Sequence, residues 1–273
     1  MTGSSLSLPF VKMEGAGNDY VFVDAVRHEF DCDRGPELAS VVADRHFGIG
    51  SDGLIAMTRS EVADVRMHMW NADGSRGAMC GNGVRCLAKL AYDSGLIEGD
   101  TLSVETDGGL RETELVFEGD EVVGARVDMG EVTVASDTTR VTVAGREVDY
   151  IAGDAGNPHA VVFCSSRVDD VPVLEWGAAF QQLAAFPDGV NVEFVHVLGD
   201  AIEQRTFERG SGETLACGSG ATVAALATMD RGLVSGDAVS VRLRGGTLRI
   251  HRRGSRLVME GPARTVFTGE MRV

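Results

Sequence analysis

The chain has 273 residues, of which 44% are hydrophobic and 24% are charged, with a formal net charge of −16. This composition is typical of a globular protein in water, and no apolar run is long enough to span a bilayer. The acidic balance excludes a basic nucleic-acid-binding face. Five cysteines are an odd number, so we expect reduced thiols. The N-terminus MTGSSLSLPFVK has no basic start followed by an apolar stretch, so we expect no signal peptide and a cytoplasmic protein.

In the first half, short β-branched segments bounded by Gly or Asp predict strands. These segments are residues 21–24, 66–70, 102–106 and 125–129. Residues 83–93 are rich in Ala and Leu, follow Cys-Gly-x-Gly at Cys80, and end near Gly95. This pattern predicts a helix that begins just after Cys80 and has glycine near its C-terminal end.

The second half predicts the same succession of elements. Strands are expected at residues 140–144, 160–163, 191–197 and 248–251. Residues 220–230 follow Cys-Gly-x-Gly at Cys217, are nearly all apolar and end near Gly232. A helix that is apolar on all sides is expected to be buried on most of them.

These parallels extend to an internal repeat. The stretch that begins MCGNG at Met79 aligns without a gap with ACGSG at Ala216, and the two cysteines are 217 − 80 = 137 positions apart. Four further blocks recur near that offset: GAGNDYVFVD with DAGNPHAVVF, SDGLIAM with PDGVNVEFV, HMWNADGS with RTFERGSG, and LSVETDGG with VSVRLRGG. Such collinear matches predict two halves of similar α/β fold, facing each other across a pseudo-twofold axis.

A cysteine at a helix N-terminus is suited to acid–base chemistry. Unpaired N–H groups there carry partial positive charge, which binds anions and lowers the pKa of a thiol. Glycines 81, 83, 218 and 220 would let a ligand approach the backbone. Two opposed thiols could remove a proton from one face of a carbon and deliver one to the other, which inverts a stereocentre.

Other signals have simpler explanations. We expect Cys32, Cys86 and Cys164 to be small buried hydrophobic side chains. His68 near Cys80 and Cys86 fits no standard zinc spacing, so we predict no metal site. The Gly-x-Gly-x-x-Gly match at residues 48–53 follows no predicted strand, so we do not predict a dinucleotide site.

The motifs KMEGAGNDY, GIGSDG, WNADGS, CGNGVRC, GNPHAVVF, DGVNVEFV, ERGSGETLACGSGA and MEGPARTVF together resemble those of diaminopimelate epimerases, from Lys12 to Phe267. The resemblance implies interconversion of LL-2,6-diaminopimelate and its meso isomer in lysine and peptidoglycan-precursor biosynthesis, with no cofactor and no metal. It implies an α+β fold of two pseudo-symmetric domains, each a mainly antiparallel sheet or barrel around a central helix. The halves would be residues 1–127 with 265–273, and residues 128–264.

The resemblance also assigns residue roles. Cys80 and Cys217 would exchange protons, and His159 and Glu208 would help to ionise and orient them. The reacting α-carboxylate would be held by Gly81, Asn82, Gly218 and Ser219. The amino groups and the distal carboxylate would be held by Asn18, Asn71, Asn157, Asn191 and Arg209, with Glu208 also lining the substrate site.

Some positions depart from the family pattern. Tyr20 and Trp70 each replace a different aromatic residue, and Ser51 replaces a frequent Ala. Arg76 adds a positive charge before Cys80, and the sequence does not give the role of this charge. The sequence does not decide whether the chain forms a homodimer. Nor does it decide which thiol acts as the base in each direction of the reaction.

Three alternatives also remain open. Proline racemases and hydroxyproline epimerases resemble a two-cysteine duplicate but carry His where this chain has Asn82, whereas phenazine-biosynthesis isomerases lack the cysteine pair. A non-catalytic amino-acid-binding module would not need both thiols. A thiol redox protein would be expected to carry Cys-x-x-Cys.

Overall fold

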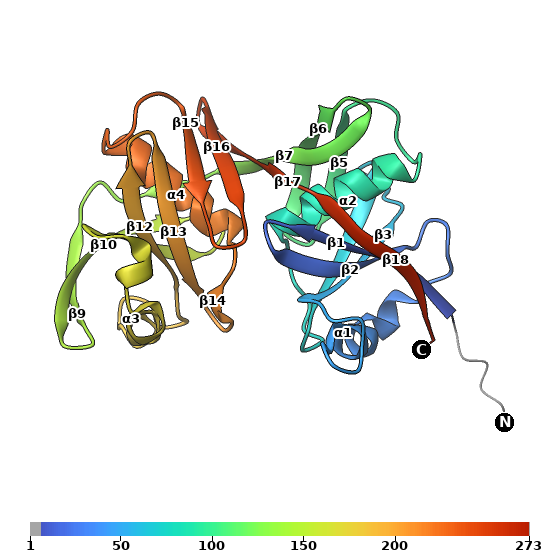
Figure 1. Ribbon diagram of the computed structural model, residues 1–273, viewed down its shortest axis with the longest axis horizontal. Helices are drawn as coiled ribbons and strands as arrows, with labels where there is room; N and C mark the ends of the chain where they lie inside the picture. The colour runs from blue at the N-terminus through green and yellow to red at the C-terminus, as the bar shows by residue number, and fades with distance from the viewer. Residues whose placement is uncertain (1–6, 273) are drawn as a thin grey trace. The chain divides into compact units, whose positions relative to one another are not determined.

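A computed structural model describes residues 7–272, which fall into two compact units (Figure 1). The first unit is Met1–Val127 with Gly261–Val273, and the second is Asp128–Glu260. The chain leaves the first unit within β7 (Glu121–Glu131) and returns within β17 (Arg256–Pro262). Residues 261–264, which the sequence had assigned to the second half, group with the first unit, where the Pro262 carbonyl accepts a hydrogen bond from Arg85.

The first unit is a mainly antiparallel sheet that wraps around helix α2 (Gly81–Asp93). Its hydrogen-bonded order is β18-β1-β2-β3-β4-β5-β6, and only the pairs β2–β3 and β4–β5 are parallel. Its other elements are β1 (Ser7–Gly15), β2 (Asn18–Asp24), η1 (Cys32–Arg34), α1 (Gly35–Ala43), β3 (Gly53–Thr58), β4 (Val65–Asn71), β5 (Thr101–Thr106), β6 (Gly109–Glu118), which pairs with β7, and β18 (Arg264–Arg272).

The second unit repeats this arrangement around helix α4 (Gly218–Asp230). The pairs from β10–β11 through β16–β17 have the same succession of senses as those from β1–β2 through β6–β7: antiparallel, parallel, antiparallel, parallel, antiparallel, antiparallel. Its other elements are β8 (Thr133–Val134), β9 (Thr139–Val143), β10 (Arg146–Asp154), β11 (Pro158–Phe163), η2 (Val168–Asp170), α3 (Val173–Phe180), β12 (Asn191–Leu198), β13 (Ala201–Glu208), β14 (Gly212–Thr214), β15 (Ala238–Arg242) and β16 (Thr247–Arg253). The predicted fold class is therefore confirmed.

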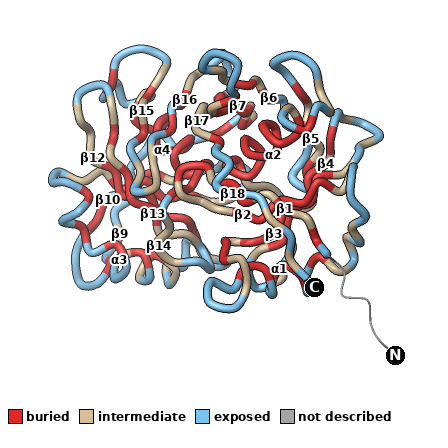
Figure 2. Tube along the Cα trace, turned by 45° about the vertical axis from the view of Figure 1, so that its right-hand side comes forward, coloured by how far each residue is buried: buried red, intermediate tan, exposed pale blue. Residues whose placement is uncertain are grey.

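Both central helices are buried along most of their length, which Figure 2 shows as red coils within the strands. In α4 the buried positions are mostly Ala, Val, Thr and Leu, whereas α2 also buries Arg85 and Lys89. The apolar sequence of the second helix thus follows from contact with strands on nearly all sides.

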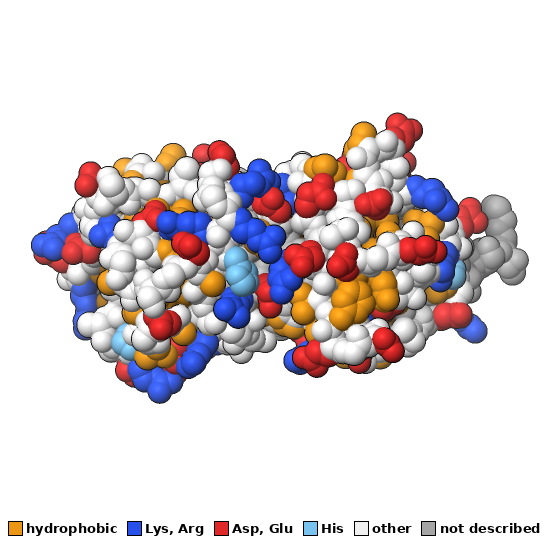
Figure 3. Space-filling view, turned by 90° about the horizontal axis from the view of Figure 1, so that it is seen from above, with side chains coloured by type: hydrophobic (Ala, Val, Ile, Leu, Met, Phe, Trp, Pro, Cys, Tyr) orange, Lys and Arg blue, Asp and Glu red, His pale blue; other side chains and the backbone are white. Residues whose placement is uncertain are grey.

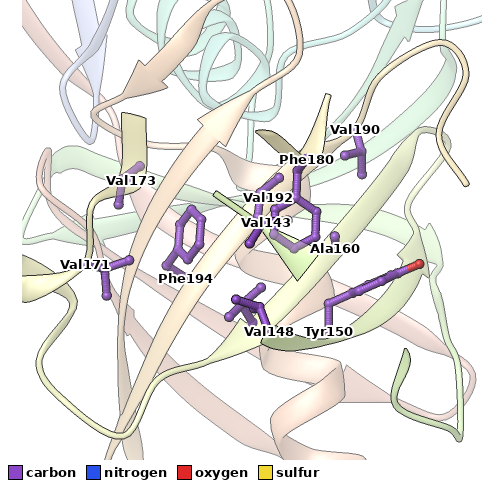
Figure 4. Packing of buried hydrophobic residues seen from close by; sticks show 11 residues of the cluster. Val143, Val148, Tyr150, Ala160, Val171, Val173, Phe180, Val190, Val192 and Phe194 are labelled. Carbon is purple, nitrogen blue, oxygen red and sulfur yellow. The ribbon is translucent and has the colours of Figure 1, made fainter. Parts of the chain in front are cut away.

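A smaller helix covers the outer face of each sheet. Beneath α3, Phe180 packs against a cluster that includes Val192 and Phe194 (Figure 4). Beneath α1, Leu38 and Val42 pack against Val21, Val23 and Leu54, together with Trp70. The strands of the parallel pairs β2–β3 and β11–β12 are buried on both faces over most of their length, which explains why they are nearly continuous apolar runs in the sequence.

Trp70 and Phe207, which the repeat aligns, show why each outer helix carries a glycine. A Cβ atom on Gly35 of α1 would collide with the Trp70 ring, and one on Gly177 of α3 would collide with the Phe207 ring. The same contact between helix backbone and aromatic ring therefore occurs in both units. It supports the alignment of HMWNADGS with RTFERGSG.

Charge is distributed unevenly between the surface and the interior. On the face that Figure 3 draws, acidic and arginine side chains are interspersed. Lys12 and Lys89, the two lysines of the chain, are both buried. The positive charge on the surface is therefore carried by arginine.

Candidate active site

Each of the two repeated cysteines is the N-cap of its central helix. The Cys80 Sγ accepts a hydrogen bond from the Gly83 N–H at 3.4 Å, and the Cys217 Sγ accepts one from the Gly220 N–H at 3.4 Å. Backbone angles at the two caps are nearly equal, φ −133° and ψ 116° against φ −123° and ψ 113°. The sequence placed both thiols correctly at helix N-termini.

In the first unit, the Cys80 thiol donates to the Asn18 Oδ1 at 3.2 Å. The Asn18 amide donates in turn to the Asp52 Oδ2 at 2.6 Å, and the same Asn18 Oδ1 accepts from the Asn82 Nδ2 at 3.3 Å. Three of the predicted residues, Asn18, Cys80 and Asn82, are thus brought together. Asp52 joins them although the sequence analysis did not select it.

Charged groups at both ends orient this amide chain. Arg85 is fully buried and donates to the Asn82 Oδ1 at 2.8 Å, so the Asn82 oxygen must face it. The Asp52 carboxylate can only accept, so the Asn18 NH₂ must face it. The Asn18 oxygen is therefore directed toward Cys80. Burial lowers the pKa of the Arg85 guanidinium.

In the second unit, carboxylates surround the thiol. Burial raises the pKa of the Cys217 thiol well above its usual range, and the Glu208 and Glu193 carboxylates add to the rise. Burial also raises the pKa of Glu208, whose Oε1 accepts from the Thr214 hydroxyl at 2.5 Å. The Cys217 Sγ lies 3.5 Å from the Ser219 hydroxyl. The expected lowering of the thiol pKa is wrong for Cys217, because burial and negative charge outweigh the helix N-terminus.

His159, on β11, is fully buried. Its Nδ1 is 2.9 Å from the Glu193 Oε1, and its Nε2 is 3.0 Å from the Asn157 Oδ1. Glu193 is also fully buried. Sequence reasoning missed Glu193, although an acidic residue in the middle of the apolar strand NVEFVHV was a signal of a buried polar role.

The remaining predicted residues lie near these groups but bond elsewhere. The Asn191 Oδ1 accepts from the Arg209 backbone N–H at 2.9 Å, and the exposed Arg209 guanidinium donates to the Asp188 carbonyl at 3.4 Å. Asn71 donates to the Ser75 hydroxyl at 2.9 Å. Their proposed contacts with substrate stay predictions.

Arg76 holds the segment that leads to Cys80. Its guanidinium pairs with Asp107 and lies 3.3 Å from the His68 Nδ1. Beside it, the Gly108 N–H donates to the Ala78 carbonyl at 2.8 Å. Arg76 therefore helps to fix the loop before the thiol to the β5–β6 turn.

Of the other cysteines, Cys86 is buried as expected, whereas Cys32 and Cys164 are only partly buried, so the expectation is wrong for these two. Burial raises the pKa of Cys86, inside α2, to about 12, and that of Cys164 to about 11. Thiols with such pKa values are protonated at neutral pH. Among residues 7–272, no cluster of three or more His, Cys, Asp or Glu side chains has the arrangement of a metal site, and no helix is long and apolar enough to cross a membrane.

Three comparisons place these features among known proteins. The family profile described as Diaminopimelate epimerase matches residues 10–135 and 151–266. A diaminopimelate epimerase of Desulfovibrio desulfuricans is 42% identical over 97% of this chain and 99% of its own length. One of Methanococcus maripaludis is 39% identical, again over 97% and 99%.

Solved structures share the fold at low sequence identity. A phenazine biosynthesis protein of the PhzF family from Bacillus anthracis has a TM-score of 0.75 at 15% identity, over 98% of this chain and 100% of its own. A hydroxyproline epimerase from Agrobacterium vitis has a TM-score of 0.74 at 15% identity, over 100% and 94%.

Proposed function

Since the chain belongs to the diaminopimelate epimerase family, we propose that it interconverts LL- and meso-2,6-diaminopimelate in lysine biosynthesis, with Cys80 and Cys217 as its two proton-transfer groups. The observation that carries the proposal is the family match over nearly the whole chain, together with a fold that places a cysteine at the N-cap of each central helix.

The helix N-termini support binding of the reacting carboxylate. The first intrahelical bonds run from the Val84 N–H to the Cys80 carbonyl and from the Ala221 N–H to the Cys217 carbonyl. The backbone N–H groups just before them, those of Gly81, Asn82, Gly218 and Ser219, have no acceptor within the helix, and the helix dipole adds positive charge there. In the proposal they hold the substrate's α-carboxylate.

The reaction then needs no redox change. One cysteine, as thiolate, takes the α-proton and becomes a thiol, while the electron pair of the broken C–H bond stays on the α-carbon and its carboxylate. The other cysteine, as thiol, gives its proton to the opposite face of that carbon and becomes a thiolate. Hydrogen-bond donors at the carboxylate stabilise the charge that develops in the transition state.

The other predicted residues have supporting roles in this scheme. His159 and Glu208 set the charge around the thiols in this scheme. Glu208 lies beside Cys217 and also interacts electrostatically with His159, which supports this role. The substrate's amino groups and distal carboxylate would be held by Asn18, Asn71, Asn157, Asn191 and Arg209.

Solvent-isotope exchange tests the proposal directly. With LL-diaminopimelate in deuterated water, the enzyme is expected to form the meso isomer with deuterium at the inverted carbon. L-proline and trans-4-hydroxy-L-proline, supplied separately, are expected to remain unchanged. Turnover of either proline compound without diaminopimelate turnover would contradict the assignment.

The proposal includes a metal-independent and pyridoxal-independent reaction in the cytoplasm. Activity is expected to survive exhaustive chelation, and an activity that vanished with chelator and returned with a metal ion would contradict it. Sedimentation velocity on the active enzyme would measure whether two copies associate.

A further inference from the structure

The fully buried carboxylate of Glu193 has no role in the scheme above. It lies on β12, beside His159 on the neighbouring parallel strand β11 and against the first turn of α4. Its Oε1 is 2.9 Å from the His159 Nδ1, and its Oε2 has no hydrogen-bond partner among the described residues. Burying a carboxylate costs free energy that an apolar side chain would not cost, so packing alone does not account for the pair.

Gly220 provides the space that this carboxylate occupies. A Cβ atom at Gly220 would collide with the Glu193 Oε1. The second glycine of the motif at Cys217 therefore accommodates a protein carboxylate, while the approach of a ligand to its backbone stays a prediction. Gly220 also donates its N–H to the Cys217 Sγ. It therefore contacts both the Glu193 carboxylate and the Cys217 thiol.

We infer that Glu193 is a positioning residue that fixes the proton of His159 on Nδ1 and so confines proton gain and loss to Nε2. An ionised carboxylate can only accept, so the nitrogen that faces it must carry a proton. A carboxylate that orients an imidazole in this way sets its tautomer and direction.

Asn157 completes the arrangement at the other nitrogen. Its amide presents an oxygen to a protonated Nε2 and, turned over, an NH₂ to an unprotonated one. His159 can therefore change charge without losing its bond to Glu193. The titratable groups that act on this cluster are Glu208 from β13 and Cys217 at the start of α4. The inference rests on the proposed function where it concerns turnover.

The first test is spectroscopic and does not depend on catalysis. In ¹⁵N-histidine-labelled enzyme, with the resonances of His159 assigned by their loss in His159→Gln, we expect a proton on Nδ1 and a carboxylate-bonded Nδ1–H signal. In Glu193→Gln the side-chain amide can either accept or donate, so the tautomer is expected to become mixed. A wild-type His159 without a proton on Nδ1 would overturn the inference.

The second test is kinetic. Glu193→Gln is expected to lower kcat/KM by about ten- to a hundredfold, as for other residues that orient a functional histidine, and to move one limb of its pH profile. Glu193→Asp is expected to recover part of the loss. Gln204→Leu, a buried polar substitution in the same unit, controls for packing, and its pH profile should match the wild type.

These outcomes separate the inference from the proposed function. A wild type that does not turn over diaminopimelate would refute the function, while the histidine spectrum would still report on Glu193. An active Glu193→Gln enzyme with the wild-type spectrum and pH profile would refute the positioning role. Equal shifts in Gln204→Leu and Glu193→Gln would refute it as well.

Discussion

Cys80 and Cys217 occupy the same position in two units of the same topology, but the side chains around them differ in charge. Aligning the repeats through Asn18 with Asn157 and Trp70 with Phe207 sets candidate site residues of the second unit against their counterparts in the first. With the residue of the first unit named first, the pairs are Tyr20 and His159, Asn71 and Glu208, and Ala72 and Arg209. Ile55 and Glu193 make a fourth pair, because each would meet a Cβ atom on the equivalent helix glycine, Gly83 or Gly220.

The difference separates what the fold requires from what the chemistry requires. Capping, the central helix and the strand order are the same in both units, so they are the conditions for presenting a thiol at a helix N-terminus. The first unit surrounds its thiol with neutral amides held between Arg85 and Asp52. In the second, burial raises the pKa of the Cys217 thiol, and the neighbouring Glu208 and Glu193 carboxylates add to the rise. A pair of groups in unlike surroundings is suited to hold one thiol as acid while the other acts as base.

Removing either thiol tests whether both are needed. Cys80→Ala and Cys217→Ala are each expected to lower kcat by about a hundred- to ten-thousandfold, because a positioned proton-transfer group contributes about 10²–10⁴ in rate. Substrate should still bind, which calorimetry would measure. Loss of activity in only one of the two variants would contradict the two-base scheme.

The unequal surroundings also predict unequal reactivity. Iodoacetamide followed by peptide mass spectrometry is expected to modify the partly exposed Cys80 before the buried Cys217. Faster modification of Cys217 would contradict a thiol whose pKa is raised by burial and neighbouring carboxylates.

Substitutions of Arg209 test whether the second unit, which has the charged side chains, also binds the distal carboxylate of the substrate. A guanidinium binds a carboxylate through two parallel hydrogen bonds, and losing a charge-assisted contact costs about 1.5–3 kcal/mol. Arg209→Ala is therefore expected to lower kcat/KM for diaminopimelate by roughly ten- to a hundredfold. Arg209→Lys should recover only part, since an ammonium group does not reproduce the planar geometry.

The aligned residue of the first unit supplies the control. Ala72→Arg adds a guanidinium at the equivalent position, and steady-state kinetics should then show no gain for diaminopimelate. An Arg209→Ala enzyme with unchanged kcat/KM would refute this assignment.

The two helix glycines give a smaller, graded effect. A Cβ at Gly83 would lie 2.7 Å from the Ile55 Cδ1, the mobile end of an apolar side chain, whereas one at Gly220 would displace the Glu193 carboxylate. Both alanine variants are expected to lose about 1–3 kcal/mol of unfolding free energy through overpacking, measured by urea denaturation. Only Gly220→Ala should also change the pH profile, and a matching change in Gly83→Ala would contradict the comparison.

The sequence predicted the repeated architecture and both capping cysteines. Glycine motifs and apolar periodicity can be recognised within a short stretch of sequence, and here each pattern occurs once in each half. It did not predict Asp52, Arg85 or Glu193 as parts of the site. Each acts through another side chain, so its partner becomes visible only when strands that are distant in the sequence are paired. The thiol pKa was predicted in the wrong direction for Cys217 for the same reason, since burial and neighbouring carboxylates are properties of the folded unit.

The smallest predicted effect concerns the stability cost of Glu208. Burial raises its pKa above the ordinary value of 4.5, so the unfolded chain loses this proton at a lower pH than the folded chain. Unfolding then releases a proton in the window above 4.5, and stability falls as pH rises through that window. Below it both states hold the proton and the cost disappears. Glu208→Gln carries no such cost at any pH.

Glu208→Gln is therefore expected to unfold at a higher temperature than the wild type near pH 7, by about 2–4 °C for each kcal/mol recovered, with a smaller difference near pH 4. Its activity should fall, because the carboxylate beside Cys217 is lost. Glu213→Gln is the matched control: Glu213 receives two hydrogen bonds from the buried Arg205, at 2.7 and 2.9 Å, so its loss should lower the melting temperature near pH 7. Calorimetry at both pH values separates the cases, and a destabilised Glu208→Gln near pH 7 would mean that Glu208 belongs to the stabilising charges of the fold.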